Sequence, residues 1–543
     1  MKKIITFQKL IRMKHILYSV FVCIVALTIH SCLTAEAKTS KTDFNSNLVI
    51  KEAYTSTKFF GPNAAQVPHD VPNPADSSQV DLSVFAWKEF IALNWPSSYN
   101  TTTHERGKPD PKATVSDFLK SSNNGKLVWH TYKHRVEMYP QATSNYNTKF
   151  NTAPQYLYDR KGKKPITSFN PKYTKPLSEV DTIFNNLDET SEINLCTLFV
   201  DGDPNAPEAT NANKSKTASG LPGAPRRMIY EAKGNQGMFD YVVKSNLYDS
   251  ITRANKIKYT ENEIKNNGKG AVYQSKPDPK MIVFPFGENG GVEGSIEVKA
   301  TWRQLTMKEY KSGRYLTAPI LYYRGGTLEK PNPEGRAFYD IVPAEPTAKT
   351  LPYGLVGLHI IHKTKTFPSY VFATFEQVDN LNTTIEANNN LFYYNRNSNP
   401  SVNPNKQYAY RANAILQKTE LVNADVHKQI KTLNLKSVWQ YYKLIGVQGH
   451  PQNNANTTDY FLANIATETN QTLRDFSGTL DSNNGTFNPQ AINLYQGKKK
   501  KIVQGGCKGC HGNAQDADFS FITKNAPITD VDFINQPLLK KNQ

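Results

Sequence analysis

The sequence predicts an α+β fold: a large body that contains an antiparallel sheet flanked by helices, followed by a short helical C-terminal segment. Two observations carry this prediction. Between about residues 226 and 380, runs of β-branched and aromatic residues show period-2 stretches, and Gly and Pro clusters rather than helices separate them. Helical patterns stand on either side of that region. The 543 residues are ample for a hydrophobic core, and 30 Gly and 32 Pro without a period exclude a collagen-like chain.

The N-terminus has the pattern of an export signal. Residues 1–31 contain five Lys and Arg and no acidic residue. All five basic residues precede a mainly apolar run at 16–29. We therefore predict a signal peptide over 1–31, because the apolar run is too short to span a membrane comfortably. Cys32 ends a lipobox-like sequence and is our favoured site of lipidation, whereas an A-x-A sequence at 35–37 offers ordinary cleavage instead. Both routes predict export, to the periplasmic face or as an outer-membrane lipoprotein.

The mature chain divides into three predicted parts: an extended tether at 32–80, an α+β body at 81–470 and a C-terminal segment at 471–543. Removal of residues 1–31 takes away five positive charges and lowers the formal net charge from +18 to +13. A basic chain can attract nucleic acid, an anionic membrane or an acidic protein. Export argues against nucleic acid, so we expect no nucleic-acid partner.

Three helices are predicted in the body. The apolar and aromatic pattern from about Leu82 to Pro96 predicts the first, with Ser83 as a possible cap. The second is predicted at 127–139, where His130 and His134 would share one helical face. The third is predicted at about 426–444.

Five strands are predicted between the second and third helices. Their residues are rich in β-branched and aromatic side chains, and Gly and Pro clusters bound them. Since no helical spacers intervene, we expect antiparallel pairing. The predicted ranges are 227–231, 294–305, 315–324, 351–363 and 369–377.

The C-terminal segment contains the most specific motif of the chain. Cys507, Cys510 and His511 form C-x-x-C-H, the attachment signature of haem c. Two thiols three positions apart on one helical turn can form thioethers with the two vinyl groups, and the adjacent imidazole can bind the iron. A zinc site would need a second ligand pair, and the 300 residues before Cys507 contain no other cysteine. We therefore predict one covalently bound haem c.

The position of this motif bears on the sixth iron ligand. No Met or His follows His511, and the last Met is Met307. Any sixth ligand must therefore come from upstream, so we expect the body to cover the haem. The segment around the motif is too short for an independent core.

Several longer strings support a family resemblance. In chain order they are FAWKEFIALNWP at 85–96, GSIEVKATWRQL at 294–305, LVGLHIIHKTKTFPSYVFATFEQVDN at 355–380, LANIATET at 462–469 and GCKGCHGNAQDADFSFI at 506–522. Over about residues 80–525 the chain resembles a little-characterised family of exported bacterial proteins described as cytochrome c family proteins. The resemblance implies a covalent haem and electron transfer, and it implies no known substrate.

His359 and His362 are the leading candidates for the distal iron ligand. They lie in one predicted strand at an odd spacing, so they point to opposite faces and only one can meet a given haem. We place His362 slightly ahead because it lies at the end of the strand, where the chain turns. His130 and His134 are the alternative pair. The single Cys196, in an apolar stretch, is expected to be a buried thiol.

A run of four lysines, Lys498, Lys499, Lys500 and Lys501, ends six positions before Cys507. Such a run is typical of a solvated loop, but beside a haem it could also attract an acidic redox partner protein.

Two functions remain open at this point. An electron-transfer cytochrome would hold six-coordinate iron, whereas a haem-dependent oxidoreductase, a peroxidase-like enzyme or a haem-based sensor would keep one iron position open. Whether the protein is an enzyme is therefore undecided by its sequence.

Overall fold

The computed structural model describes the larger part of the body and one piece of the C-terminal segment. The described residues are 56–71, 78–120, 126–140, 146–154, 183–187, 197–200, 226–267, 278–324, 338–347, 350–380, 392–395, 407–408, 415–449, 462, 464–467 and 506–525. None of the helices in these ranges is both long enough and apolar enough to cross a membrane.

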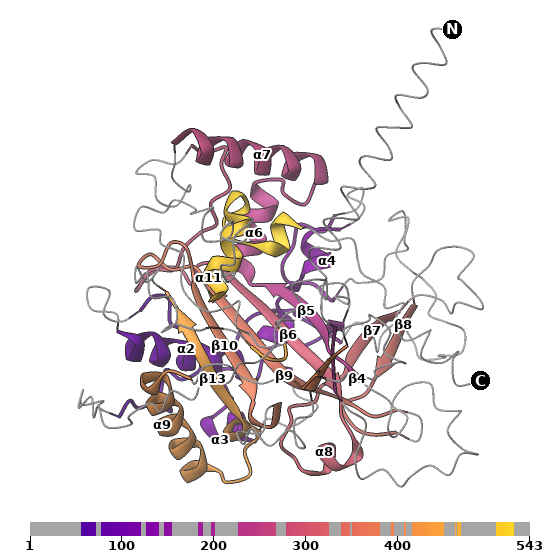
Figure 1. Ribbon diagram of the computed structural model, residues 1–543. Helices are drawn as coiled ribbons and strands as arrows, with labels where there is room; N and C mark the ends of the chain where they lie inside the picture. Colours follow the sequence, from indigo (N-terminus) through magenta and orange to yellow (C-terminus); the bar gives the residue numbers. More distant parts are fainter. Residues whose placement is uncertain are drawn as a thin grey trace.

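A six-stranded antiparallel sheet forms the centre of the molecule (Figure 1). Every pair of neighbouring strands runs antiparallel, which confirms the predicted mixed α+β class and its antiparallel sheet. The strands β6, β9 and β10 match the predicted ranges closely. In spatial order the strands are β1 (Lys133–His134), β5 (Ile229–Gly234), β6 (Ile296–Gln304), β9 (Tyr353–His362), β10 (Val371–Gln377) and β13 (Tyr442–Gln448).

The two faces of this sheet have different coverings. Leu358 and Ile360 of β9 point into the main hydrophobic core, whereas Ile361 points to the opposite face, as the period of two requires. Every residue of β9 is buried, because both faces of the sheet are covered. A strand buried on both faces is typically rich in apolar residues, as this one is.

Helices cover the core face of the sheet. Figure 1 shows α2 (Gln79–Leu93) and α9 (Gln417–Leu433) beside β13. Apolar side chains of α2, of α9 and of the short α3 (Val115–Leu119) join the main core cluster together with those of the strands. The ring of Phe90 contacts the rings of Phe375 and Trp439 there, with centroid distances of 4.4 and 5.6 Å. Burial of such rings is a large part of what stabilises this layer.

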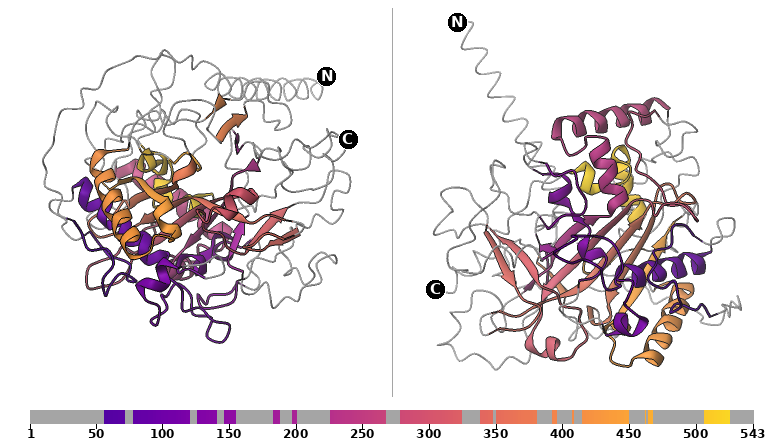
Figure 2. Two further views of the ribbon diagram at one scale, coloured as in Figure 1. Left: turned by 90° about the horizontal axis from the view of Figure 1, so that it is seen from below. Right: turned by 180° about the vertical axis from the view of Figure 1, so that it is seen from behind.

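The described C-terminal residues lie on the other face. They form α11 (Gly506–His511), the 3₁₀ helix η7 (Gly512–Ala517) and α12 (Phe521–Lys524). The views in Figures 1 and 2 place these elements beside α6 (Gln236–Lys244) and α7 (Ser250–Asn267), and α7 packs on η7. The sheet therefore separates the C-terminal elements from α2 and α9.

Seven further strands form two smaller sheets. One has the order β12 (Gln407–Tyr408), β11 (Phe392–Asn395), β3 (Thr197–Val200) and β4 (Arg226–Arg227). The other has the order β2 (Asn185–Leu187), β7 (Ile320–Arg324) and β8 (Phe338–Val342), with β2 parallel to β7. Only residues 320–324 of the strand predicted at 315–324 are in a strand.

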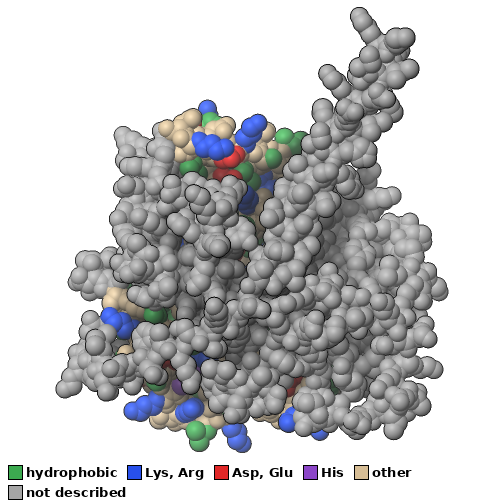
Figure 3. All heavy atoms as spheres, viewed as in Figure 1, with side chains coloured by type: hydrophobic (Ala, Val, Ile, Leu, Met, Phe, Trp, Pro, Cys, Tyr) green, Lys and Arg blue, Asp and Glu red, His purple; other side chains and the backbone are tan. Residues whose placement is uncertain are grey.

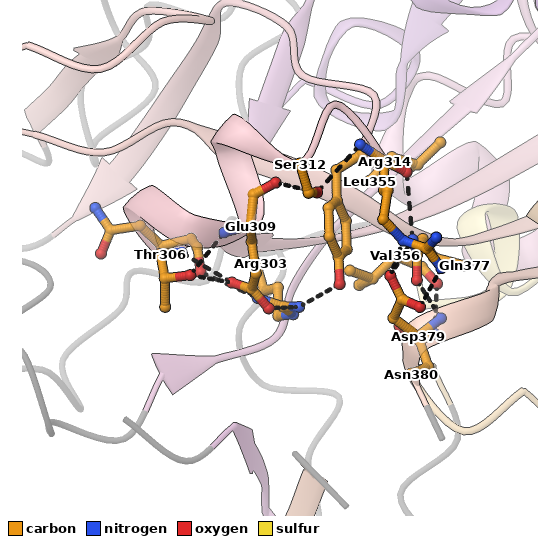
Figure 4. A network of polar contacts seen from close by, with 12 residues as sticks. Arg303, Thr306, Glu309, Ser312, Arg314, Leu355, Val356, Gln377, Asp379 and Asn380 are labelled. Carbon is orange, nitrogen blue, oxygen red and sulfur yellow. Dashed lines mark hydrogen bonds and ion pairs between the residues drawn. The ribbon is translucent and has the colours of Figure 1, made fainter. Parts of the chain in front are cut away.

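A polar network fixes one end of the large sheet to its surroundings (Figure 4). Arg303 of β6 is fully buried and donates two hydrogen bonds, of 2.9 and 2.5 Å, to the carboxylate of Glu309 in α8 (Met307–Lys311). Arg314 also donates two hydrogen bonds to the carboxylate of Asp379, the second residue after β10. Bidentate pairs of this kind add geometric specificity, so they hold α8 and the end of β10 in register with the sheet.

Three sequence predictions about helices need correction. The first helix begins earlier than predicted, because Ser78 rather than Ser83 is its cap and forms a capping box with Asp81. The predicted helix at 127–139 is broken into short pieces, since β1 pairs with β5 there. The predicted helix at 426–444 ends at Leu433, and the following chain forms β13.

The predicted tether also reaches less far than expected. Phe59, Phe60 and Val71 belong to the main core cluster, and the Ser56 hydroxyl donates to Asp425 of α9 at 2.9 Å. Residues 56–71 are therefore part of the body rather than of an extended tether.

A buried charge cluster ties α4 (Arg135–Met138) to the connection between α2 and α3. Arg106 donates two hydrogen bonds to Glu137, and Lys133 lies 3.4 Å from the same carboxylate. Burial alone would raise the pKa of Glu137, but Arg106 and Lys133 outweigh it and lower that pKa to about 2. Ionised Glu137 thus stabilises the fold.

Replacing Glu137 with Gln is expected to destabilise the protein in a pH-dependent way. The folded pKa of about 2 lies below the ordinary value of 4.5, so the stabilisation is present above pH 4.5 and disappears as the pH falls towards 2. At pH 7 the loss should be about 3 kcal/mol, and roughly 2 kcal/mol of it should vanish between pH 5 and pH 3. Urea unfolding of both proteins at several pH values checks this. A difference that stays constant down to pH 3 would contradict it.

Candidate functional site

The helix that bears the C-x-x-C-H motif is fastened to the end of β13. The side-chain carbonyl of Gln448 accepts a hydrogen bond from the backbone N–H of Lys508 at 2.9 Å, and the Lys508 Nζ donates to the carbonyl of Gly449 at 2.7 Å. Gly506 starts the helix with φ at +66°, where a Cβ would lie 2.9 Å from the Gln448 side chain. Glycine meets both demands without strain. The motif is thus held in a fixed position.

The two cysteines lie on one side of α11. They are separated by three positions, close to one helical turn, and they are thiols rather than a disulfide. Cys507 is buried in a small apolar cluster on this face of the sheet, and Cys510 is partly exposed. The other members of the cluster are Ile361, Tyr370, Phe372, Leu462 and Phe519.

The imidazole of His511 is oriented by a hydrogen bond to the backbone. Its Nδ1 lies 2.7 Å from the carbonyl oxygen of Phe519. Since a carbonyl can only accept, Nδ1 must carry the hydrogen, and the lone pair of the neutral ring is then on Nε2. Burial lowers the pKa of His511 to about 4, so the neutral ring is the form present at neutral pH. A hydrogen bond of this kind orients a histidine that binds a metal through its other ring nitrogen.

The turn that supplies this carbonyl has an unusual backbone. Asp518 and Phe519 are consecutive non-glycine residues with φ of +53° and +65°. Residues other than glycine adopt this region at a cost of about 1–3 kcal/mol, and such positions cluster at functional sites. The turn is held by the body, because the Asp518 carboxylate forms a buried ion pair with Lys363 and accepts a hydrogen bond of 2.6 Å from the Phe284 N–H.

Two further hydrogen bonds attach the segment to the body. The Ser520 hydroxyl donates to Glu297 of β6 at 2.8 Å, and the hydroxyls of Tyr139 and Thr523 lie 2.7 Å apart. Residues 506–525 therefore pack on the body through buried polar contacts as well as through the apolar cluster.

His359 and His362 point to opposite faces, as their spacing predicts. His359 lies on the face that carries the C-terminal elements, and His511 is one of the charges that lower its pKa, after burial and Lys299, to about 3. His362 lies on the other face. Its Nδ1 is hydrogen-bonded to Glu89 of α2, and its Nε2 lies 2.6 Å from the carbonyl of Glu293.

These contacts argue against His362 as the distal ligand. Both of its ring nitrogens are engaged, and the Glu89 carboxylate raises the pKa of His362 although burial acts the other way. A protonated imidazole with two hydrogen-bonded nitrogens has no lone pair to offer a metal.

The alternative pair is not a ligand pair either. His130 and His134 do not share a helical face. His130 lies in a 3₁₀ helix, whereas His134 is the last residue of β1 and the N-cap of α4. The His130 ring packs on Trp129 and Trp302 in the main core, with centroids 4.3 and 6.3 Å away. The Nε2 of His134 lies 3.0 Å from the Asn186 carbonyl, and its Nδ1 accepts from the Val136 N–H.

Several predicted residues lie outside the described part of the chain. They are the signal peptide at 1–31, Cys32, Cys196 and the lysines Lys498, Lys499, Lys500 and Lys501. Within the described ranges, three or more His, Cys, Asp or Glu side chains do not gather into a metal cluster. Two thiols and an adjacent neutral imidazole on one turn are the protein groups that haem c requires, so the residues present fit that group.

Local sequence pattern does not predict the contacts of three supporting groups: the Phe519 carbonyl, the Lys363–Asp518 ion pair and the Gln448 side chain. Their contacts join residues separated by 8, 155 and 60 positions. A lysine directly after the apolar strand β9 was the one visible hint, because a lysine there must either be exposed or find an acid.

No protein-family model matches the chain, and it matches neither a curated protein nor a solved structure.

Proposed function

We propose that this protein is an exported c-type cytochrome with one covalently bound haem that serves in electron transfer. Cys507 and Cys510 would form the two thioethers, and His511 would bind the iron. The observation that carries the proposal is the hydrogen bond from His511 Nδ1 to the Phe519 carbonyl, beside two thiols one turn apart. When bound, the haem supplies an iron that takes up and releases one electron.

The chain's own groups prepare this site. The hydrogen bond to Phe519 fixes the tautomer of His511, and the turn at Asp518 and Phe519 fixes the position of the accepting carbonyl. The apolar cluster around Cys507 excludes water from one side of the segment. An apolar, rigid surrounding limits rearrangement when the charge of the iron changes, which suits electron transfer.

The surface near the segment supports a proposal about the partner. Helix α7 packs on η7. It contains two glutamates but four basic residues, which are Arg253, Lys256, Lys258 and Lys265. Figure 3 shows Lys and Arg side chains gathered at the top of that view, where α7 lies. A basic surface beside the redox group favours encounter with an acidic redox protein. The lysines at 498–501 would add to it, and a lipid on Cys32 would hold the protein at a membrane.

The proposal is tested by the haem content of the wild-type protein. We expect the protein, produced by export in a host that attaches haem c, to keep one haem per chain after denaturation. Intact mass spectrometry should show the processed chain plus one haem, and the alkaline pyridine spectrum should be that of a haem joined by two thioethers. A bare polypeptide mass, in a host that matures a control c-type cytochrome, would overturn the proposal.

A further inference from the structure

The histidines of β9 are separated by the sheet. Leu358, Ile360 and His362 lie on the face of α2, and Gly357, His359 and Ile361 lie on the face of the C-terminal elements. Only the second set can meet a group bound by α11.

Register places His359 near His511. The His511 ring packs on Phe372 of β10, with centroids 4.9 Å apart. Phe372 pairs with Ile361, and Thr374 pairs with His359, so Phe372 and His359 are diagonal neighbours across the two strands. Such neighbours lie about 7–8 Å apart and within reach of long side chains. The His511 imidazole of α11 thus lies over a strand residue that neighbours His359 on the same face of the sheet.

The coverings of this face meet at His359. On one side of His359 along β9, Gly357 lies close to Asn464: a Cβ added to Gly357 would be 3.1 Å from the side-chain nitrogen of Asn464. That nitrogen donates a hydrogen bond to the Thr374 hydroxyl. On the other side, Ile361 belongs to the cluster with Cys507. His359 is therefore at the boundary between residues 464–467 and residues 506–525.

Other candidates among the described residues are less well placed. The ring nitrogens of His134 and His362 are engaged, and the Nε2 of His427 lies 2.6 Å from the Tyr442 carbonyl on the core side. The sulfur atoms of Met138 and Met238 lie against Gly234 of β5. Since β5 is three strands away from β10 and strands are about 4.8 Å apart, they are roughly 14 Å from the strand beneath His511.

We propose that His359 would bind the haem iron as a second protein ligand besides His511, so that two histidines of the chain would hold the iron. This inference rests on the proposed function. It predicts an electron carrier rather than an enzyme with an open iron position, because two ligands from the chain would leave no iron position open.

The test compares His359→Ala with wild type at equal haem content. We expect the wild-type spectrum to be low-spin and unchanged by carbon monoxide when reduced. The His359→Ala protein should keep its haem, become high-spin and bind carbon monoxide, and added imidazole should restore the low-spin spectrum. His362→Gln and His450→Ala are the matched controls, and both should stay low-spin; His450 follows Gly449 and lies outside the described residues.

The outcomes separate the two proposals. A wild-type chain without haem overturns the proposed function. A haem-containing wild type that is high-spin, or a spin change in His450→Ala and not in His359→Ala, overturns only the assignment of His359. Should His359→Ala fail to fold, near-infrared magnetic circular dichroism of the wild type decides. We expect a bis-histidine band, and a band of a methionine or amine ligand would overturn the inference.

Discussion

Replacing Lys363 with Met is expected to lower the free energy of unfolding by roughly 3–5 kcal/mol. Lys363 and Asp518 are fully buried, and burial raises the pKa of Asp518 while the lysine opposes that shift. Without the lysine, the carboxylate would be left buried with no cation beside it. The loss is measurable by urea unfolding, and it should be accompanied by earlier proteolysis of residues 506–525.

The chain offers a matched control two residues away. Lys365 pairs with Glu288 at the surface, where both side chains are about half exposed. Lys365→Met should therefore cost less than about 1 kcal/mol. The double variant Lys363→Met with Asp518→Asn should recover most of the loss, because asparagine is uncharged and can still accept from the Phe284 N–H. Equal losses in Lys363→Met and Lys365→Met would contradict the structural role of the buried pair.

Replacing both Cys507 and Cys510 with Ser is expected to abolish covalent haem attachment completely. The thioethers are the covalent links, so haem should be extracted from the variant by acidified acetone and its mass should be that of the polypeptide alone. The body should stay folded, since Cys507 belongs to a small cluster separate from the main core. Intact mass spectrometry and circular dichroism check the two parts of this expectation.

Cys196→Ser is the control for this experiment and should keep one haem per chain. Haem that resists extraction from the double-serine variant would mean that other residues hold it covalently. Loss of haem from Cys196→Ser alone would show that the motif is not sufficient.

The central part of the fold was predictable from local pattern. The strands β6, β9 and β10 are long, rich in β-branched residues and bounded by turn residues, so short-range signals describe them well. The strand β13 was missed because Tyr442–Gln448 follows a true helix and has no turn residue to mark the change. Its pairing with β10, about 70 positions earlier, is what makes it a strand. Long-range pairing overrides local preference in this way.

The candidate site was predictable in its motif and not in its supports. The spacing of Cys507, Cys510 and His511 is local, so the sequence alone reveals it. The opposite facing of His359 and His362 also followed from the period of two. The period of two does not tell which of the two histidines faces α11, because this depends on the contact of His362 with Glu89, 273 positions earlier. No local pattern encodes such a contact.

The burial of Cys507 also sets an order of events during biogenesis. In the docked segment this thiol is only 5% exposed and lies beneath Phe519 and against Ile361. An enzyme that attaches haem must bind the motif while it is an accessible peptide. Under the proposed function, thioether formation therefore has to precede the packing of residues 506–525 on the body. Folding of the sheet and attachment of haem then compete in time. A chain that docks too early would be a kinetically trapped, colourless form, and slower docking would raise the yield of the mature protein.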